Sequence, residues 1–154
     1  MKALTLWQPW ASLILAGVKP YEFRNWPAPT HLIGHHIAIH AAARPVKKAD
    51  VADLITRLRG SQPWSTALKP DALDLLERLH TAPGSLPLSC ILCTAVLGRP
   101  TRADSILGEF GGPAPGARDP RANWAWPLTD IRPLMPPVPA RGAQGLWDCG
   151  DLHA

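Results

Sequence analysis

Charged side chains are scarce in this chain of 154 residues, at 18% of the sequence, whereas apolar side chains reach 46%. This balance excludes a disordered, solvated chain, because such a composition supplies enough apolar surface for a core. Cysteine is also rare, and three thiols are too few, and odd in number, for a disulfide scaffold. No apolar run is long enough to span a membrane. We therefore expect a cytoplasmic protein with no membrane partner.

The sequence also lacks the short motifs that mark common enzyme chemistries. It contains no P-loop, no G-x-G-x-x-G, no G-x-S-x-G and no H-E-x-x-H. Walker-type nucleotide hydrolysis and dinucleotide redox chemistry are therefore disfavoured, and we expect no cofactor. Cys90 and Cys93 are spaced C-x-x-C, but no second ligand pair stands at a zinc-site spacing. Residues three apart on a strand face opposite sides, so we predict two core thiols and no metal site.

Basic residues and tryptophan are what the sequence has in excess. Lys and Arg number 16 against 12 acidic residues, a formal net charge of +4, and seven residues are Trp. Cationic and aromatic side chains together suit phosphates and stacked bases. We therefore expect RNA, single-stranded nucleic acid or a nucleotide as partner. The simpler alternative is the modest basicity that many soluble proteins show.

Hydrophobic periodicity predicts an α+β fold in a single domain, residues 1–154. Strands are expected over 2–7, 21–26, 33–41, 87–97, 123–131 and 145–149, and helices over 9–17 and around 51–58 and 73–79. Residues 98–122 lack periodicity and are predicted to form a long loop. A proline-rich connector is expected between the last two strands. The elements predict a small barrel of five to six strands with two to three flanking helices.

The densest polar chemistry lies in residues 17–26. If this strand buries Tyr21 and Phe23, then Glu22 and Arg24 point together to its other face, about 6.5 Å apart.

That face is predicted to look toward the helix that carries Trp10, with Lys19 at the mouth of a cleft. Two cations and one carboxylate around a cleft would hold a phosphate and a polar base edge together. The alternative is a partly exposed Glu22–Arg24 ion pair that contributes at most about 1 kcal/mol.

Residues 4–26 resemble the opening of the ASCH domain family, whose hallmark is a G-x-K-x-x-E-x-R stretch. Gly17, Lys19, Glu22 and Arg24 match that stretch. The similarity continues through 34–42 and returns at 124–130 and 142–147. It covers nearly the whole chain, with 43–85 as a helical insertion and 98–122 as a variable loop.

This resemblance implies a β-barrel similar to the PUA domain, with a cleft that carries the Lys-Glu-Arg group and binds RNA or a nucleotide. Lys19 and Arg24 would contact phosphate, and Glu22 would accept a hydrogen bond from a base or a ribose hydroxyl. Tryptophan side chains flanking the group would stack on a base. The implied ligand-binding residues are Gln8, Trp10, Lys19, Glu22, Arg24, Trp26 and Gln144.

The resemblance also carries an alternative of another class, a small hydrolase. Some ASCH relatives are described as ribonucleases or as amidohydrolases of acylated cytidine. Here Lys19 and Glu22 would form the acid/base pair, and His40 would assist. The amidohydrolase branch places a Thr nucleophile at the fourth position of K-x-x-T. Glu22 occupies that position, so the nucleophile of that branch is missing.

The remaining basic and aromatic residues divide between two interpretations. Trp7, Trp126 and Trp147 fit strand positions and are predicted to lie in the core. Four arginines of the 98–122 segment either contact backbone phosphates or serve solubility alone: Arg99, Arg102, Arg118 and Arg121. A third interpretation, docking onto a protein partner, predicts a sizeable exposed apolar patch.

Overall fold

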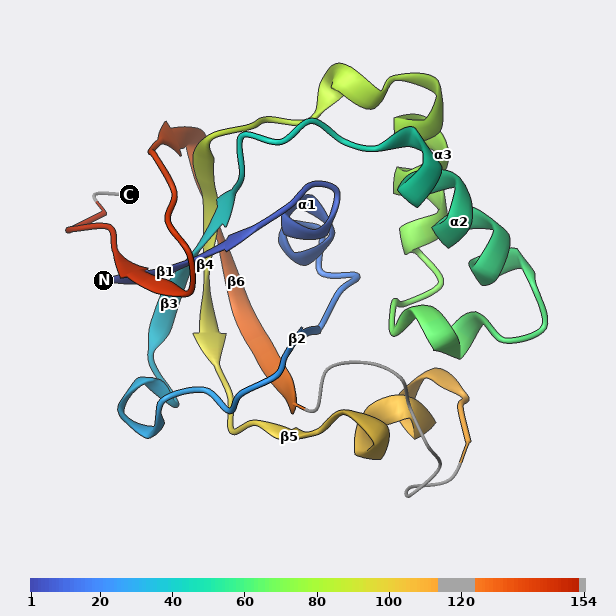
Figure 1. Ribbon diagram of the computed structural model, residues 1–154, viewed down its shortest axis with the longest axis horizontal. Helices are drawn as coiled ribbons and strands as arrows, with labels where there is room; N and C mark the ends of the chain where they lie inside the picture. The colour runs from blue at the N-terminus through green and yellow to red at the C-terminus, as the bar shows by residue number, and fades with distance from the viewer. Residues whose placement is uncertain (114–123, 153–154) are drawn as a thin grey trace.

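A curved mixed sheet forms one side of the molecule, and a layer of helices forms the other (Figure 1). The computed structural model describes residues 1–113 and 124–152. The strands are β1 (Lys2–Leu6), β2 (Tyr21–Arg24), β3 (His36–Ala41), β4 (Cys90–Leu97), β5 (Thr101–Arg102), β6 (Trp124–Pro139) and β7 (Leu146–Asp148). The α-helices are α1 (Trp10–Leu15), α2 (Lys48–Arg59) and α3 (Ala72–Thr81). Four 3₁₀-helices complete the described elements: η1 (Thr30–Leu32), η2 (Pro63–Thr66), η3 (Pro83–Ser85) and η4 (Ala103–Phe110).

The strands are ordered β2-β6-β4-β3-β1-β7, and β5 pairs with β6 beside this path. β1 runs parallel to β3, and the other pairs are antiparallel. Because β2 and β7 stand at the two ends of the path, the sheet is a half-barrel. The predicted α+β fold is confirmed, with three α-helices as expected and seven strands among the described residues instead of five to six.

Helix α1 lies between the sheet and the pair α2–α3 (Figure 1). Ile14 packs with Leu4 and Leu6 of β1 in the largest core cluster, whereas Leu13 packs with α2 and α3 in a second one. Leu13 and Ile14 are both fully buried. Burial of one such side chain stabilises a fold by roughly 1.5–3 kcal/mol. The short helix is therefore fixed from both sides, and so is the chain that leaves its C-terminal end.

Two expectations about the chain beyond β4 are corrected. The predicted proline-rich connector is wrong, because β6 continues to Pro139 and pairs with β4 through Pro133 and Pro139. Register shifts interrupt this pairing, which suits prolines that have no N–H to donate. The predicted long loop is wrong over 101–110, where β5 and η4 form, and its residues 114–122 lie outside the described residues. The single domain and the 43–85 insertion stay predictions, although both helices predicted there are present as α2 and α3.

A register shift in β4 also corrects the argument about its two thiols. Cys90 and Cys93 do not face opposite sides, because the ladder shifts between Ile91 and Cys93 and both thiols pack in one core cluster. The core-thiol prediction itself is confirmed, since both are buried and free. Burial raises the pKa of the Cys93 thiol to about 12. Within the described ranges, no helix has the length and apolar character needed to cross a bilayer.

Candidate functional site

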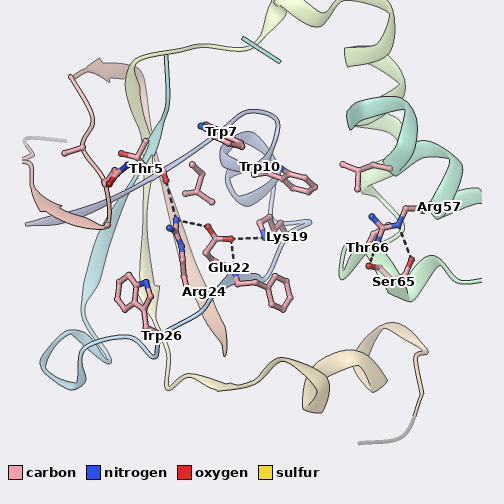
Figure 2. Close-up of a pocket in the computed structure, with 16 residues that line it drawn as sticks. Thr5, Trp7, Trp10, Lys19, Glu22, Arg24, Trp26, Arg57, Ser65 and Thr66 are labelled. Atoms are coloured by element: carbon pink, nitrogen blue, oxygen red, sulfur yellow. Dashed lines mark hydrogen bonds and ion pairs between the residues drawn. The ribbon is translucent and has the colours of Figure 1, made fainter. Parts of the chain in front are cut away.

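A cavity of about 700 Å³ opens between two walls (Figure 2). One wall comes from β1, α1 and β2, and the other from α2 and η2. Residues 143–145, before β7, also belong to the lining. The volume lies within the range of small-ligand sites, which is roughly 300–1,000 Å³. Its charged lining consists of Lys19, Glu22, Arg24 and Arg57, a formal charge of +2.

The end of α1 places Lys19 at this cavity. Gly17 takes a left-handed conformation, with φ of +76°, which a residue without Cβ adopts at little cost. Its N–H donates to the Ile14 carbonyl at 2.9 Å, and the Val18 N–H donates to the Leu13 carbonyl at 3.1 Å. This pair of bonds is the Schellman motif, accompanied by packing of Val18 in the same cluster as Leu13. The chain therefore turns sharply and enters β2 after Lys19 and Pro20.

Strand alternation in β2 separates its apolar and polar residues only in part. Tyr21 and Phe23 pack toward a cluster that includes residues of η4, while Glu22 and Arg24 line the cavity, but Phe23 lines the cavity as well. The Tyr21 hydroxyl donates to Glu109 at 2.6 Å on that other side. Burial and this neighbouring carboxylate raise the pKa of Tyr21, so its hydroxyl stays protonated.

Lys19, Glu22 and Arg24 form one ion group, which Figure 2 shows at the inner wall of the cavity. Glu22 Oε2 accepts from Arg24 at 3.1 Å, and Oε1 lies 3.4 Å from Lys19 Nζ. Oε1 also accepts the Phe23 N–H at 2.9 Å. Glu22 is only 9% exposed, so the carboxylate is the enclosed partner of the Glu22–Arg24 pair, whereas the Arg24 side chain is 25% exposed.

Lys19 is more enclosed than a residue at the mouth of a cleft, which corrects that expectation. It is 6% exposed, and its Nζ donates to the Tyr21 carbonyl at 2.6 Å. Nζ also lies 5.7 Å from the centre of the Trp10 ring and 5.1 Å from that of Phe23. Both distances are within cation–π range. The ammonium is thus held by the fold and faces the cavity as a fixed charge.

Arg24 is the more accessible cation of the group, with its side chain 25% exposed. Its guanidinium also donates to the Thr5 carbonyl at 3.4 Å, which ties β2 to the end of β1. The Nε atom is buried and has no hydrogen-bond partner among the described residues.

The tryptophans predicted to flank the group are both part of the lining. Trp26 is 38% exposed and stands edge-on to the buried Trp126, with ring centres 4.8 Å apart. The Trp126 indole N–H donates to the Trp26 carbonyl, which holds this residue in place. Gln144 also lines the cavity, from the opposite end of the chain. The structure therefore brings Trp10, Trp26 and Gln144 to the same cavity as the ion group.

Sequence reasoning missed the wall of the cavity that α2 and η2 form. Arg57, in the last turn of α2, donates from Nε to the Ser65 hydroxyl at 3.3 Å and also to the Ser65 carbonyl. It further pairs with Asp53 at 3.4 Å, one helical turn earlier. Thr66 stands beside Ser65 in the lining. The sequence signal was weak, because an Asp–Arg pair at i,i+4 is typical of a solvated helix surface.

Trp7 also lines the cavity, and its prediction as a core residue is wrong. It follows β1 and is 57% exposed, whereas Trp126 is fully buried as predicted. The guanidinium carbon of Arg44 lies 3.8 Å from the centre of the Trp7 ring.

Two predicted site residues, Gln8 and His40, lie outside the cavity lining. Gln8 is buried, and its amide bonds to Ser12 and to the Pro87 carbonyl. It therefore fixes the start of α1 and does not face a ligand.

His40 is 1% exposed and lies behind Thr5. Its Nε2 lies 2.7 Å from the Ala140 carbonyl, which can only accept, so this nitrogen carries the proton. In the neutral ring, Nδ1 then accepts from the Thr5 hydroxyl at 3.2 Å, and that hydroxyl accepts from Trp147. The assignment of His40 as an assisting catalytic group is therefore corrected, because both ring nitrogens are engaged away from the cavity.

The predicted phosphate-contacting arginines do not join the cavity. Arg99 and Arg102 are exposed near β5, and the Arg102 guanidinium carbon lies 5.6 Å from the centre of the Trp124 ring. Arg118 and Arg121 lie outside the described residues. Within the described residues, 1–113 and 124–152, no cluster of three or more His, Cys, Asp or Glu side chains is placed to hold a metal ion.

Fold and site together define an α+β protein with a cationic, tryptophan-lined cavity at the junction of a half-barrel and its helices. The ASCH domain family model matches residues 4–96, more than half of the chain, and the chain belongs to this family. The resemblance carried by the G-x-K-x-x-E-x-R stretch is thereby confirmed. Among solved structures, the crystal structure of a mutant ZmASCH protein from Zymomonas mobilis is similar, with a TM-score of 0.46 and 17% sequence identity. The alignment covers 90% of this chain and 72% of that one. No curated protein matches the chain.

Proposed function

We propose that this ASCH-domain protein binds single-stranded RNA or a nucleotide in the cavity between β2, α1 and α2. The ASCH family is generally associated with RNA binding. The observation that carries the proposal is the enclosed Lys19–Glu22–Arg24 group in a lining of formal charge +2. Two cations paired with one carboxylate, and a third cation on the opposite wall, favour an anionic ligand that also offers a hydrogen-bond donor.

Each part of a nucleotide has a matching group in this proposal. Arg24 and Arg57 are the more exposed cations and would contact phosphate. Lys19 is more enclosed and would attract the same phosphate through its charge. Glu22 would accept from a base amine or a ribose hydroxyl. The indoles of Trp10 and Trp26 would stack on the base, which contributes roughly 1–3 kcal/mol per base.

The experiment compares two substitutions that remove the same charge. Lys19→Met keeps an aliphatic chain against the two aromatic rings but removes the ammonium from the cavity. Lys69→Met removes an exposed ammonium that does not line this cavity. We expect Lys19→Met to weaken binding of a labelled single-stranded RNA about tenfold or more, in fluorescence anisotropy at one fixed low salt concentration. Lys69→Met should leave the affinity within about twofold.

Equal affinity of a folded Lys19→Met protein and the wild type would refute the assignment of this cavity. A salt series on the same samples tests the arginines outside it. If Arg99 and Arg102 contact phosphates, their joint replacement by Ala should flatten the slope of log affinity against log salt by roughly 0.7 for each phosphate that is no longer neutralised.

A further inference from the structure

The most exposed aromatic side chain on the cavity rim is Trp7, at 57%, ahead of Trp26 at 38%. Leu4 and Leu6 of the preceding strand point into the core, so strand alternation sends Trp7 to the other side. A large apolar ring left in water at the edge of a cavity is the kind of surface that binding would cover. Figure 2 shows the Trp7 side chain above Trp10, at the upper edge of the cavity.

Arg44 holds this indole in place. Its guanidinium carbon lies 3.8 Å from the centre of the ring, a close stacking contact. Arg44 is itself steadied by Asp50, 3.9 Å away. Because the ring is already ordered by Arg44, a ligand that stacks on it loses little side-chain entropy. The same guanidinium places a positive charge beside the ring.

From these contacts we propose that Trp7 is a second base-stacking platform, so that the ligand is a single strand of at least two nucleotides. This inference rests on the proposed function, in which a first nucleotide occupies the cavity. The following base lies on Trp7, and the phosphate that links the two nucleotides lies near Arg44. An aromatic ring can stack on any base, so the contribution of Trp7 to affinity depends on the length of the strand and not on its sequence.

The test measures the affinities of adenosine monophosphate and of the dinucleotide pApA for the full chain. We expect the wild type to bind the dinucleotide about 5- to 150-fold more tightly, the gain that one stacked base supplies. Trp7→Ala should abolish this gain, so that the ratio of the affinities for the dinucleotide and the mononucleotide falls to about one. Trp7→Phe, which keeps a ring, should restore most of it. Met135→Ala, which removes an exposed apolar side chain outside the cavity, is the control and should preserve the gain.

The two proposals fail in different ways. Equal affinity of the wild type for one and two nucleotides, or an equal loss for both ligands in Trp7→Ala, would overturn the Trp7 platform and leave nucleotide binding standing. Absence of binding for both ligands would overturn the proposed function, and the platform with it. Because Trp7 is exposed, its variants are expected to fold, and far-UV circular dichroism checks that they do.

Discussion

Replacement of Glu22 by Gln tests whether this carboxylate holds the ion group together. The substitution keeps the size of the side chain but removes the one negative charge between Lys19 and Arg24. Both cations would then share a largely enclosed space without a counter-charge. Removal of one partner from a buried ion pair costs about 3–5 kcal/mol.

The lower end of that range applies to Glu22, because the two cations keep other stabilising contacts. Lys19 still donates to the Tyr21 carbonyl, and Arg24 is one-quarter exposed and therefore partly solvated. We expect a loss of about 3 kcal/mol in the free energy of unfolding. For a domain of this size, roughly 2–4 °C per kcal/mol lowers the melting temperature by about 6–12 °C.

Thermal unfolding and urea titration of purified protein measure this loss. Glu77→Gln is the matched control, because Glu77 pairs with Arg59 on the surface, where an ion pair contributes at most about 1 kcal/mol. A Glu22→Gln protein as stable as the control would refute the reasoning. The variant also raises the formal charge of the cavity lining from +2 to +3. We therefore expect ligand preference to move toward more highly phosphorylated nucleotides.

Three further predictions follow from single positions. Cys93 should resist alkylation by iodoacetamide at pH 8 until the protein unfolds, because a pKa near 12 keeps it protonated, and mass spectrometry measures the adduct. Gly142→Ala should cost about 1–3 kcal/mol in urea unfolding, since a Cβ there would lie 2.6 Å from the His40 ring. Gly108→Ala, with no atom within 4 Å of an added Cβ, is its control. The protein should not deacylate N4-acetylcytidine at a chromatographically measurable rate, because Glu22 replaces the Thr nucleophile of that family branch; released cytidine would contradict this.

The inner wall of the site could be predicted from the sequence because its signals are local. Alternation over four residues of β2 suffices to put Glu22 and Arg24 on one face. Gly17 ends α1 through a conformation that glycine favours, so the position of the helix end follows from one residue.

The parts that sequence reasoning missed depend on tertiary packing. Arg57 belongs to the site only because α2 packs over α1, and no local pattern encodes that contact. The prediction of Trp7 as a core residue rests on its fit to a strand position, although alternation from Leu4 and Leu6 indicates the opposite face. The proline-rich half of β6 was misjudged because register shifts, which no single-chain pattern reveals, allow prolines in a paired strand.

The hydrogen bonds of the Glu22 carboxylate suit the binding role that we propose for this cavity. A carboxylate offers about four lone-pair sites to hydrogen-bond donors. Glu22 Oε1 accepts from the Phe23 N–H beside Lys19, and Oε2 accepts from Arg24, so Oε2 keeps a lone pair for a donor of the ligand. His40, the other candidate base, uses both ring nitrogens behind Thr5. Charges that are ordered before a ligand arrives suit recognition, because little reorganisation accompanies binding. The same network that fixes these cations thus also orders the carboxylate that a ligand donor would contact.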